Sequence, residues 1–458
     1  MSAKKILVIG AGPGGYPAAF RARELGAEVT VVERAHPGGV CLNWGCIPSK
    51  SFLDSAHRLH GLEALKDLLQ DDSATALSLL RRAASWDKIQ NRRRLVVEKQ
   101  RVALRKSFDA KGIKYVQGEA RFLSASEAEI KTAQGTVSEK FDAAIAAAGT
   151  VPFFPPPFDP ARGALLDSNS VFELPRMPAS IIIVGGGVIG VEFSCFFNAL
   201  GSQVTIVEMA PSLIPGEDEA LSRLLKTSFE KRGIKIHLGK KAVSVDGAAG
   251  APKRLVLEDG TALEADEIMV CAGRVAALDS LGLDKIGVAW DRRGVKVDQS
   301  FNCGPSNIYF VGDMNALSML AHAASAQGLC AAELAMGRPG HYDNNLIPRC
   351  IYTWPEIASI GLDKKQAEAA GYSVKQHKAF LLGSGRALAQ GETEGVFQLV
   401  SDTATGKLLG AQLSGIYATE LLHVLAVALN SFMTVEQLKK VVFAHPTVAE
   451  SLHEALSK

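Results

Sequence analysis

The chain has 458 residues, of which 47% are hydrophobic and 21% charged, and its formal net charge is +2. This length is enough for about three domains of globular composition, and the charge gives no electrostatic case for a nucleic-acid or membrane partner. No run approaches the ~18 apolar residues of a membrane span, and we expect no signal peptide. The seven scattered cysteines do not suggest a secreted disulfide framework, so we expect a cytoplasmic protein whose functional cysteines are redox-active.

The first part of the chain has the pattern of a dinucleotide-binding unit. An apolar run leads into a GxGxxG, and a helix-like stretch and a second apolar run follow, the latter ending in Glu33. In this pattern Gly10 allows a tight turn, Gly12 lets a pyrophosphate approach, and Gly15 lets the helix pack on the strand. Glu33 can accept hydrogen bonds from ribose hydroxyls. A Gly-rich turn alone is weak evidence, but these features in this order predict a nucleotide site.

Two cysteines, Cys41 and Cys46, follow in the stretch GGVCLNWGCIPSK. Paired zinc ligands favour two intervening residues, whereas four lie between these cysteines. Five positions of a regular helix rise about 7.5 Å, beyond the about 7 Å that a disulfide spans between Cα atoms, so a bond requires a distorted turn. Asn43 or Gly45 can supply it through a positive φ, and a helix opening near Pro48 would favour a thiolate. A static disulfide or two inert core cysteines remain the alternatives.

The middle of the first half contains helices and then strands. Residues 51–117 are predicted to be mainly helical, and 113–149 to form short strands. The basic stretch between Trp86 and Lys111 is interpreted as a solvated helix face rather than a nucleic-acid surface, because acidic residues interrupt it. The proline-dense segment 151–160 marks a domain border.

The opening pattern recurs after this border. A strand leads to Gly185, Gly187 and Gly190, and a later strand ends in Glu208. The acid lies 23 positions after the first glycine in both copies, which indicates an internal repeat and two dinucleotides bound per chain. Glu208 would bond the 2′-hydroxyl of NAD and repel the 2′-phosphate of NADP, so we expect NAD.

The last third of the chain adds two candidate sites. Strands over 234–274 are expected to close the second domain, and antiparallel strands followed by helices are expected from residue 346 onward. Asp313 follows an apolar run and can bind a ligand at the end of a sheet, although a turn aspartate fits equally. His445 can act as a base oriented by Glu450, with a surface histidine as the alternative.

Together these motifs resemble the flavoprotein disulfide reductases, and within them the dihydrolipoamide dehydrogenases. The resemblance runs from Ile6 to Glu450 and rests on GGVCLNWGCIPSK, both glycine fingerprints, IYFVGD and HPTVAE. The IPSK segment and the Ala321-His322 pair favour the lipoamide branch over glutathione reductases. Mercuric reductases commonly carry a C-terminal cysteine pair, and no such pair follows Cys350 in this sequence. Departures from the family pattern occur at Trp44, the turn 147–149, Ala323 and Gln327.

The resemblance implies an α/β fold with two Rossmann-like dinucleotide-binding domains and an α+β dimerisation domain. The implied ranges are 1–150 and 275–345 for FAD, 151–274 for NAD and 346–458 for the dimer interface. The implied reaction oxidises protein-bound dihydrolipoamide to lipoamide through a Cys41–Cys46 disulfide, with electrons passing by way of FAD to NAD+. Cys41 would meet the substrate and Cys46 the flavin. His445 and Glu450 would come from the other subunit of a homodimer.

The resemblance also assigns cofactor and partner contacts. FAD would be held by Gly10, Gly12, Gly15, Glu33, Lys50, Gly149, Asp313 and Ala321. NAD would be held by Gly185, Gly187, Gly190, Glu192, Glu208 and Gly273, with Glu192 pairing Lys50 beside the isoalloxazine. The implied partner is either the lipoyl domain of an acyltransferase in a 2-oxo acid dehydrogenase complex or a glycine cleavage carrier protein. The first alternative would link the enzyme to glycolysis. No metal is implied. A reductase of a glutathione-like disulfide or mercuric ion, and a non-catalytic scaffold or redox sensor, are the alternatives.

Overall fold

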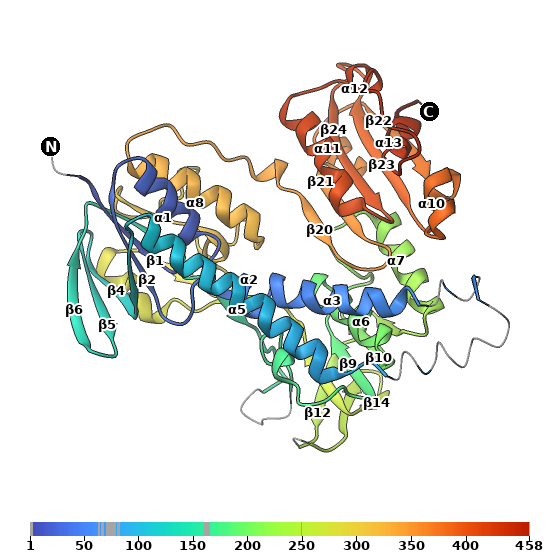
Figure 1. The fold of residues 1–458 in the computed structure, drawn as a ribbon, viewed down its shortest axis with the longest axis horizontal. Helices are drawn as coiled ribbons and strands as arrows, with labels where there is room; N and C mark the ends of the chain where they lie inside the picture. The colour runs from blue at the N-terminus through green and yellow to red at the C-terminus, as the bar shows by residue number, and fades with distance from the viewer. Residues whose placement is uncertain are drawn as a thin grey trace. The chain divides into compact units, whose positions relative to one another are not determined.

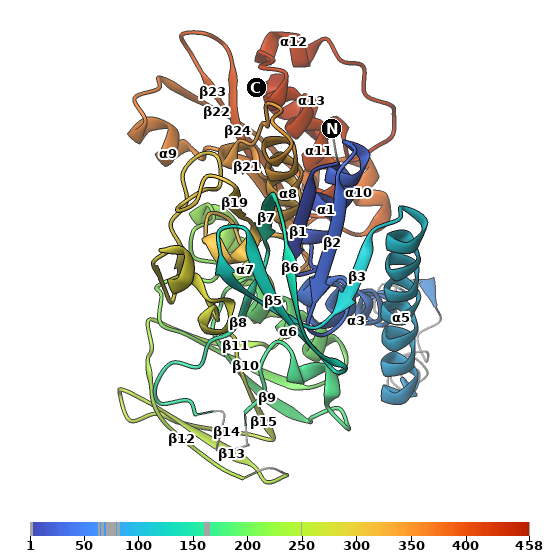
Figure 2. The same cartoon turned by 90° about the vertical axis from the view of Figure 1, so that its left-hand side faces the viewer.

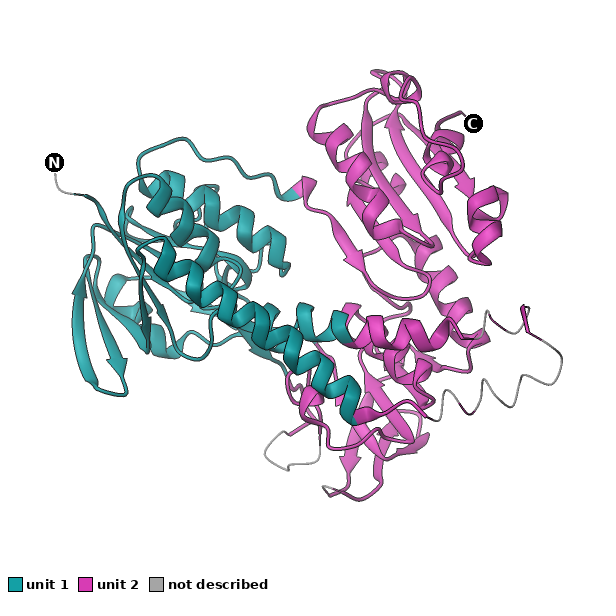
Figure 3. Cartoon of the chain, viewed as in Figure 1, with its two compact units in different colours: residues 1–51, 87–153, 273–344 teal, residues 52–86, 154–272, 345–458 magenta. Residues whose placement is uncertain are grey.

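The computed structural model describes residues 3–62, 65, 68–69, 79, 83–159, 165–248 and 250–457. The chain divides into two compact units (Figure 3). Unit 1 comprises residues 1–51, 87–153 and 273–344, and unit 2 comprises residues 52–86, 154–272 and 345–458. Each unit therefore joins stretches that are far apart in the sequence.

A five-stranded parallel sheet lies at the centre of unit 1 (Figures 1 and 2). Its strands, in spatial order, are β19 (Ile308–Phe310), β7 (Ala143–Ala146), β1 (Lys5–Ile9), β2 (Glu28–Glu33) and β3 (Lys114–Gln117). Leu7 pairs with Thr30 on one side and with Ala144 on the other. Almost all residues of β1, β2 and β7 are buried, because a parallel sheet is covered on both faces.

Two apolar layers cover the faces of this sheet. Ile6 and Val8 point to the layer that contains α1 (Gly15–Glu24), α5 (Trp86–Ala110) and α8 (Ala321–Ala335). Leu7 and Ile9 point to the opposite layer, where Phe122 lies. The antiparallel sheet of this second layer consists of β4 (Glu119–Ser124), β5 (Glu127–Thr132) and β6 (Gly135–Lys140).

Unit 1 also contains shorter elements. They are α2 (Gly39–Trp44), the start of α3 (Cys46–His60), the paired strands β8 (Thr150–Pro152) and β16 (Arg274–Ala276), the paired strands β17 (Trp290–Asp291) and β18 (Gly294–Val295), and the 3-10 helices η5 (Asp279–Leu281), η6 (Leu283–Ile286) and η7 (Gly312–Asn315).

Unit 2 contains a second parallel sheet, with the strand order β11 (Lys235–Leu238), β10 (Gln203–Glu208), β9 (Ser180–Val184) and β15 (Glu267–Val270). Helix α6 (Val188–Ala199) connects β9 to β10, and α7 (Glu219–Lys231) connects β10 to β11. The β9–α6–β10 segment repeats the β1–α1–β2 segment of unit 1, so the predicted structural repeat is confirmed. An antiparallel sheet of β12 (Ala242–Asp246), β13 (Lys253–Leu257) and β14 (Ala262–Ala265) packs beside it.

The C-terminal part of unit 2 is a five-stranded antiparallel sheet, as predicted from residue 346 onward. Its strands, in spatial order, are β20 (Arg349–Ile351), β21 (Ile357–Gly361), β24 (Leu408–Ser414), β23 (Val396–Asp402) and β22 (Val374–Phe380). Its helices are α9 (Lys364–Ala369), α10 (Gly385–Gln390), α11 (Ala418–Asn430), α12 (Val435–Lys439) and α13 (Glu450–Ser457). The 3-10 helices of unit 2 are η4 (Ser170–Glu173), η8 (Asn344–Leu346, at the border between the units) and η9 (Leu381–Gly383).

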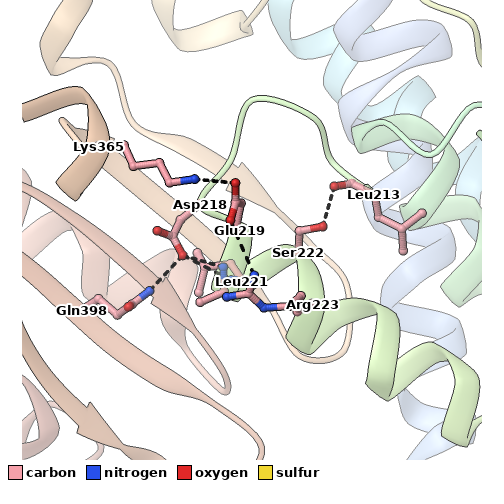
Figure 4. A network of polar contacts seen from close by, with 9 residues as sticks. Leu213, Asp218, Glu219, Leu221, Ser222, Arg223, Lys365 and Gln398 are labelled. Atoms are coloured by element: carbon pink, nitrogen blue, oxygen red, sulfur yellow. Dashed lines mark hydrogen bonds and ion pairs between the residues drawn. The ribbon is translucent and has the colours of Figure 1, made fainter. Parts of the chain in front are cut away.

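Consecutive acids at the start of α7 bond side chains of the C-terminal sheet and of α9, as Figure 4 shows for Asp218 and Glu219. The Asp218 carboxylate caps the helix by accepting from the backbone N–H of Ala220 and also accepts from the buried Gln398 amide at 3.2 Å. Glu217 accepts from Arg349 Nε at 2.8 Å. The Glu219–Lys365 pair is exposed on both sides and adds little, because solvent screens the attraction between exposed charges.

The structure corrects one expectation about the stretch between the cysteines. Neither Asn43 nor Gly45 has a positive φ: Asn43 is helical within α2, and Gly45 has φ −143°. The positive φ angles occur where α2 begins, at its N-cap Gly38 (+96°) and its first residue Gly39 (+57°). The chain therefore separates the cysteines by ending one helix and starting another, and the 7.5 Å rise of a single helix does not apply.

Other predictions about the first half agree with the structure where it is described. The helical stretch appears as α3 and α5, and the strands over 113–149 appear as β3 to β7. Residues 63–64, 66–67, 70–78 and 80–82, within the predicted helical stretch, lie outside the described residues. In the part of the chain that the structure describes, no helix has the length and apolarity needed to cross a membrane.

Aromatic rings fill the core of unit 2 next to α6. Phe52 stacks on Phe196 with ring centroids 4.6 Å apart, and Phe172 and Trp86 contact Phe52 from other sides. Phe52 and Phe196 are almost completely buried. Buried stacked rings contribute both apolar area and ring–ring attraction.

We predict that Phe196→Ala lowers the free energy of unfolding by about 3–5 kcal/mol, because it removes a ring from a closely packed cluster. Guanidinium unfolding followed by circular dichroism measures the loss. Tyr372→Ala is the control, since its side chain is exposed and its removal should cost within about 0.5 kcal/mol. A wild-type midpoint for Phe196→Ala would contradict the assignment of this cluster as core.

Candidate active site

The glycines of the two fingerprints occupy equivalent backbone positions. Gly10 and Gly185 have φ angles of +97° and +113°, and a Cβ on either would lie within 2.4 Å of a carbonyl oxygen. A Cβ on Gly15 would lie 1.8 Å from the Gly10 oxygen, and one on Gly190 would lie 1.9 Å from the Gly185 oxygen. The first and third glycines are therefore required by the protein's own packing.

The middle glycine of each fingerprint differs from the other two. A Cβ on Gly187 would have no atom within 4 Å, and one on Gly12 would meet its nearest neighbour at an ordinary 3.6 Å. The protein itself does not require a glycine at these positions. The space beside them fits a pyrophosphate that approaches the backbone, so the residues present fit the dinucleotides that the motifs predict.

The acids at the ends of β2 and β10 make the same pair of hydrogen bonds. Glu33 accepts from the backbone N–H of Ala11 and of Ala35, each at 2.8 Å. Glu208 accepts from the N–H of Gly186 and of Ala210, each at 2.6 Å. Both carboxylates are thus fixed at the edge of a fingerprint loop, and each oxygen keeps a lone pair for a ribose hydroxyl.

Three helices begin near these sequence-predicted residues without a side-chain cap. They are α1, α6 and α8, whose N-cap residues are Gly14, Gly187 and Leu320. Ala321 is the first residue of α8. Uncapped backbone N–H groups and the helix dipole form a favourable site for phosphate or another anionic group.

Asp313 lies in η7, directly after β19, and is partly buried. Burial raises the pKa of its carboxyl above the usual range, while the Arg274 charge and a 3.4 Å hydrogen bond from Thr150 act in the opposite direction. Nearby, the buried Gln327 accepts from the Gly312 backbone N–H, so this departure from the family pattern has a structural use.

Gly149 and Gly273 precede the paired strands β8 and β16, and a Cβ on either would meet no atom within 4 Å.

The two cysteines face each other across the junction of α2 and α3. Cys41 lies in α2, and Cys46 is the first residue of α3, where the helix dipole favours negative charge. In the structure the two residues are thiols rather than a disulfide. A hydrogen bond with the Cys46 side chain, followed by burial, raises the pKa of Cys41 far above its usual range, and the charge of Lys50 acts in the opposite direction.

A Cβ on Gly45 would lie 3.0 Å from the Val40 oxygen and 3.3 Å from the Cys41 Cα. The chain therefore folds back closely at this residue, and this brings α3 against the end of α2.

Sequence reasoning missed several residues that surround this pair. Burial, followed by the charges that Cys41 and Cys46 carry when ionised, raises the pKa of Tyr16 on α1. Asn43 between the cysteines is buried and hydrogen-bonds the Arg101 side chain of α5. The sequence pattern marks Asn43 only as a turn residue, and no sequence signal marks Tyr16 or Arg101, because their contacts are long-range.

His445 and Glu450 form the base-and-orienter geometry that their spacing suggests. His445 Nδ1 lies 3.0 Å from Glu450 Oε1, and Glu450 Oε2 accepts from the Thr447 backbone N–H at 2.8 Å. These two hydrogen bonds, led by the Thr447 contact, hold the pKa of Glu450 below its usual range. An ionised carboxylate at Nδ1 favours the tautomer that leaves the lone pair on Nε2, the state in which an imidazole accepts a proton.

The remaining predicted residues lie on the same elements. Lys50 is in α3 within unit 1, and its charge acts on Cys41. Glu192 is buried in α6 within unit 2, where it accepts from the Tyr352 backbone N–H at 3.1 Å. Within the described ranges, no group of three or more His, Cys, Asp and Glu side chains is arranged to hold a metal ion.

Comparisons with known proteins agree with this arrangement. Residues 4–328 match the family model of pyridine nucleotide-disulphide oxidoreductases, and residues 347–456 match the dimerisation domain of the same family. The dihydrolipoyl dehydrogenase of Bacillus subtilis is 36% identical over 455 residues, which cover 98% of this chain and 97% of that protein. That of Chlorobaculum tepidum is 37% identical over 464 residues, which cover 98% and 96%.

A solved structure shows the same fold. LpdA from Mycobacterium tuberculosis superposes with a TM-score of 0.92 at 24% identity, covering 99% of each chain. The predicted α/β fold class, with nucleotide-binding and dimerisation parts, is therefore confirmed. The family model covers more than half of the chain, and both relatives are more than a third identical over nearly their whole length. The chain belongs to the pyridine nucleotide-disulphide oxidoreductase family, the FAD-dependent and NAD-linked enzymes whose fingerprints it carries twice.

Proposed function

We propose that the chain oxidises protein-bound dihydrolipoamide to lipoamide and that NAD+ is the final electron acceptor. The observation that carries this proposal is the contact between Cys41 and Cys46, which follow directly on a dinucleotide fingerprint. Relatives that match over nearly their whole length are dihydrolipoyl dehydrogenases, and this supports the choice of substrate.

The cysteines would carry the thiol chemistry. One substrate thiolate attacks the Cys41–Cys46 disulfide, forms a mixed disulfide with Cys41 and releases Cys46 as a thiolate. The second substrate thiol displaces Cys41 and gives it its proton, and lipoamide leaves with Cys41 as a thiol, Cys46 as a thiolate and one proton on the base. Attack requires a thiolate, so this sequence needs a base that removes a proton from the substrate thiol.

His445 would be this base, because Glu450 holds Nδ1 and leaves Nε2 to accept the proton. The start of α3 favours the thiolate of Cys46, and the high pKa of Cys41 keeps the reduced pair from carrying two negative charges.

The fingerprint residues would hold the two dinucleotides. For FAD these are Gly10, Gly12, Gly15, Glu33, Lys50, Gly149, Asp313 and Ala321, and for NAD they are Gly185, Gly187, Gly190, Glu192, Glu208 and Gly273. Bound FAD supplies the coupling between thiol chemistry and hydride transfer to NAD+.

The match to a dimerisation domain over 347–456 supports a homodimer. We propose that His445 and Glu450 serve the cysteine pair of the other subunit. We also propose that the enzyme works in the cytoplasm on the lipoyl domain of a 2-oxo acid dehydrogenase complex or of a glycine cleavage carrier protein.

Cys46→Ser tests the thiol chemistry. The variant should retain its yellow flavin spectrum and lose lipoamide turnover by about three orders of magnitude or more, because the disulfide cannot form. Cys303→Ser is the control and should keep wild-type turnover. Normal lipoamide turnover by Cys46→Ser would refute the assignment.

Parallel assays of the wild type with lipoamide, glutathione disulfide and mercuric ion test the substrate. Faster NADH oxidation with glutathione disulfide or mercuric ion than with lipoamide would refute lipoamide as the substrate.

His445→Gln tests the base. It should lower kcat/KM for dihydrolipoamide by about 10²- to 10⁴-fold, because glutamine cannot accept the thiol proton. The pKa of Glu450 is depressed, so its carboxylate stays ionised above that pKa and its stabilising contact is lost only as the pH falls through it. This contact should therefore add no pH dependence above the Glu450 pKa, and any acid-side loss of dithiol oxidation that depends on the base should be absent from the His445→Gln profile and present in that of Glu450→Gln. The same decline in both profiles would exclude His445 as the base.

Glu208→Gln tests the choice of nicotinamide nucleotide. The ratio of kcat/KM for NADH over NADPH should fall about tenfold or more, since hydrogen bonds to charged groups contribute about 1.5–3 kcal/mol and the repulsion of a 2′-phosphate is removed. Flavin content, measured from the absorbance of the purified variant, should not change. An unaltered ratio would show that Glu208 does not contact the adenosine ribose.

A further inference from the structure

Asn43 lies midway between the two cysteines and is 2% exposed. Its amide nitrogen donates to the carbonyl oxygens of Pro37 at 3.1 Å and of Gly39 at 2.8 Å. Both acceptors belong to the tight turn that opens α2. The side chain therefore ties the helix that carries Cys41 to the turn that precedes it.

This turn is itself in contact with the first fingerprint. The Gly38 backbone N–H donates to the Ala11 oxygen at 2.8 Å. A Cβ on Gly39 would lie 2.7 Å from the Gly12 Cα, so the two backbones touch. Asn43 thus connects the cysteine-bearing helix to the loop at which a pyrophosphate is expected.

Arg101 of α5 occupies the other end of the Asn43 side chain. Its Nε and Nη2 groups both donate to Asn43 Oδ1, at 3.0 and 2.8 Å, and its Nη1 donates to Glu98 at 3.2 Å. A guanidinium donates only, so Oδ1 must face Arg101 and the amide nitrogen must face Pro37 and Gly39. The planar fork of Arg101 therefore fixes the orientation of the buried amide.

Arg101 reaches the segment between the cysteines through its contact with Asn43. The cation whose charge acts on the Cys41 thiol is Lys50. The Arg101 side chain is about a quarter exposed and shares its charge with Glu98, which lies one turn earlier in α5. Without Arg101, the Asn43 oxygen would be buried with no donor, and the amide could reorient at the cost of its bonds to the turn.

We propose that Arg101 is a positioning residue for the redox pair: by holding Asn43 it keeps Cys41 close to Cys46 and thereby sets the reduction potential of their disulfide. The inference rests on the proposed role of these cysteines. A disulfide is favoured over the dithiol when the fold keeps the two sulfur atoms at bonding distance. Loosening α2 would therefore destabilise the disulfide relative to the dithiol. The potential should therefore become less negative when Arg101 is removed.

Three variants of the full-length protein with bound flavin test this inference. Arg101→Ala removes the fork, and Arg101→Lys keeps the charge but loses the paired N–H groups. Arg94→Ala removes the same kind of charge from the same helix, where Arg94 is exposed and donates to the neighbouring Asn91. Each protein is equilibrated in dithiothreitol buffers of graded potential, quenched and alkylated, and the oxidised fraction of the peptide with Cys41 and Cys46 is measured by mass spectrometry.

Arg101→Ala should shift the dithiol–disulfide equilibrium about tenfold toward the dithiol, which equals about 30 mV for a two-electron couple. Arg101→Lys should shift it in the same direction by about threefold, and Arg94→Ala should match the wild type. Should Arg101→Ala fail to fold, the Arg101→Lys shift carries the test. A lower melting temperature with a wild-type potential in the Arg101 variants would show a merely structural role and overturn the inference.

The wild-type titration separates this inference from the proposed function. If the wild-type peptide never converts between dithiol and disulfide, the cysteine pair is not redox-active and the proposed function fails. If the wild type titrates and the Arg101 variants coincide with it, the function stands and only the role of Arg101 is refuted.

Discussion

Gly45 separates two helices that carry one cysteine each, and its backbone approaches Val40 and Cys41 so closely that a Cβ would require these neighbours to shift by a few tenths of an ångström. A continuous helix would hold the two sulfurs too far apart to bond. The break gives Cys46 the first position of a new helix, which favours a thiolate, while Cys41 stays in the preceding helix with its proton retained. One backbone feature thus produces both the proximity and the chemical difference of the two thiols.

The two nucleotide-binding parts also share one backbone arrangement. Both fingerprints combine a positive-φ glycine, a third glycine pressed on the first, and an acid fixed by two backbone N–H groups. The repeated unit does not define which dinucleotide it binds, since its own hydrogen bonds are the same in both copies. What differs is the following segment, because only the first copy leads into the cysteine pair. We therefore regard the repeat as a common anchor and the stretch after β2 as the part that makes this chain a thiol enzyme.

Local patterns explain which features could be predicted from the sequence. The fingerprints, the repeat and the His445–Glu450 pair depend on residues within about one strand or helix of each other, and glycine and acid spacing reports such geometry directly. The Asn43–Arg101 contact joins residues 58 positions apart, and it depends on how α5 packs, which no local pattern encodes. The expected positive φ at Asn43 or Gly45 was wrong for a related reason: it assumed that one turn had to be distorted, whereas the chain ends a helix instead.

The exposure of the base bears on how the site is completed. His445 has 83% of its side chain exposed in a single chain, and Glu450 is its side-chain hydrogen-bond partner within the described residues. A base that exposed would exchange protons with bulk water, whereas proton transfer from a bound dithiol requires the imidazole within hydrogen-bond reach of the thiol. Burial against a second subunit would meet this requirement, and the dimerisation-domain match covers the segment that carries both residues. In the proposed enzyme, dimer formation is therefore part of building the active site, because it converts an accessible imidazole into a directed base.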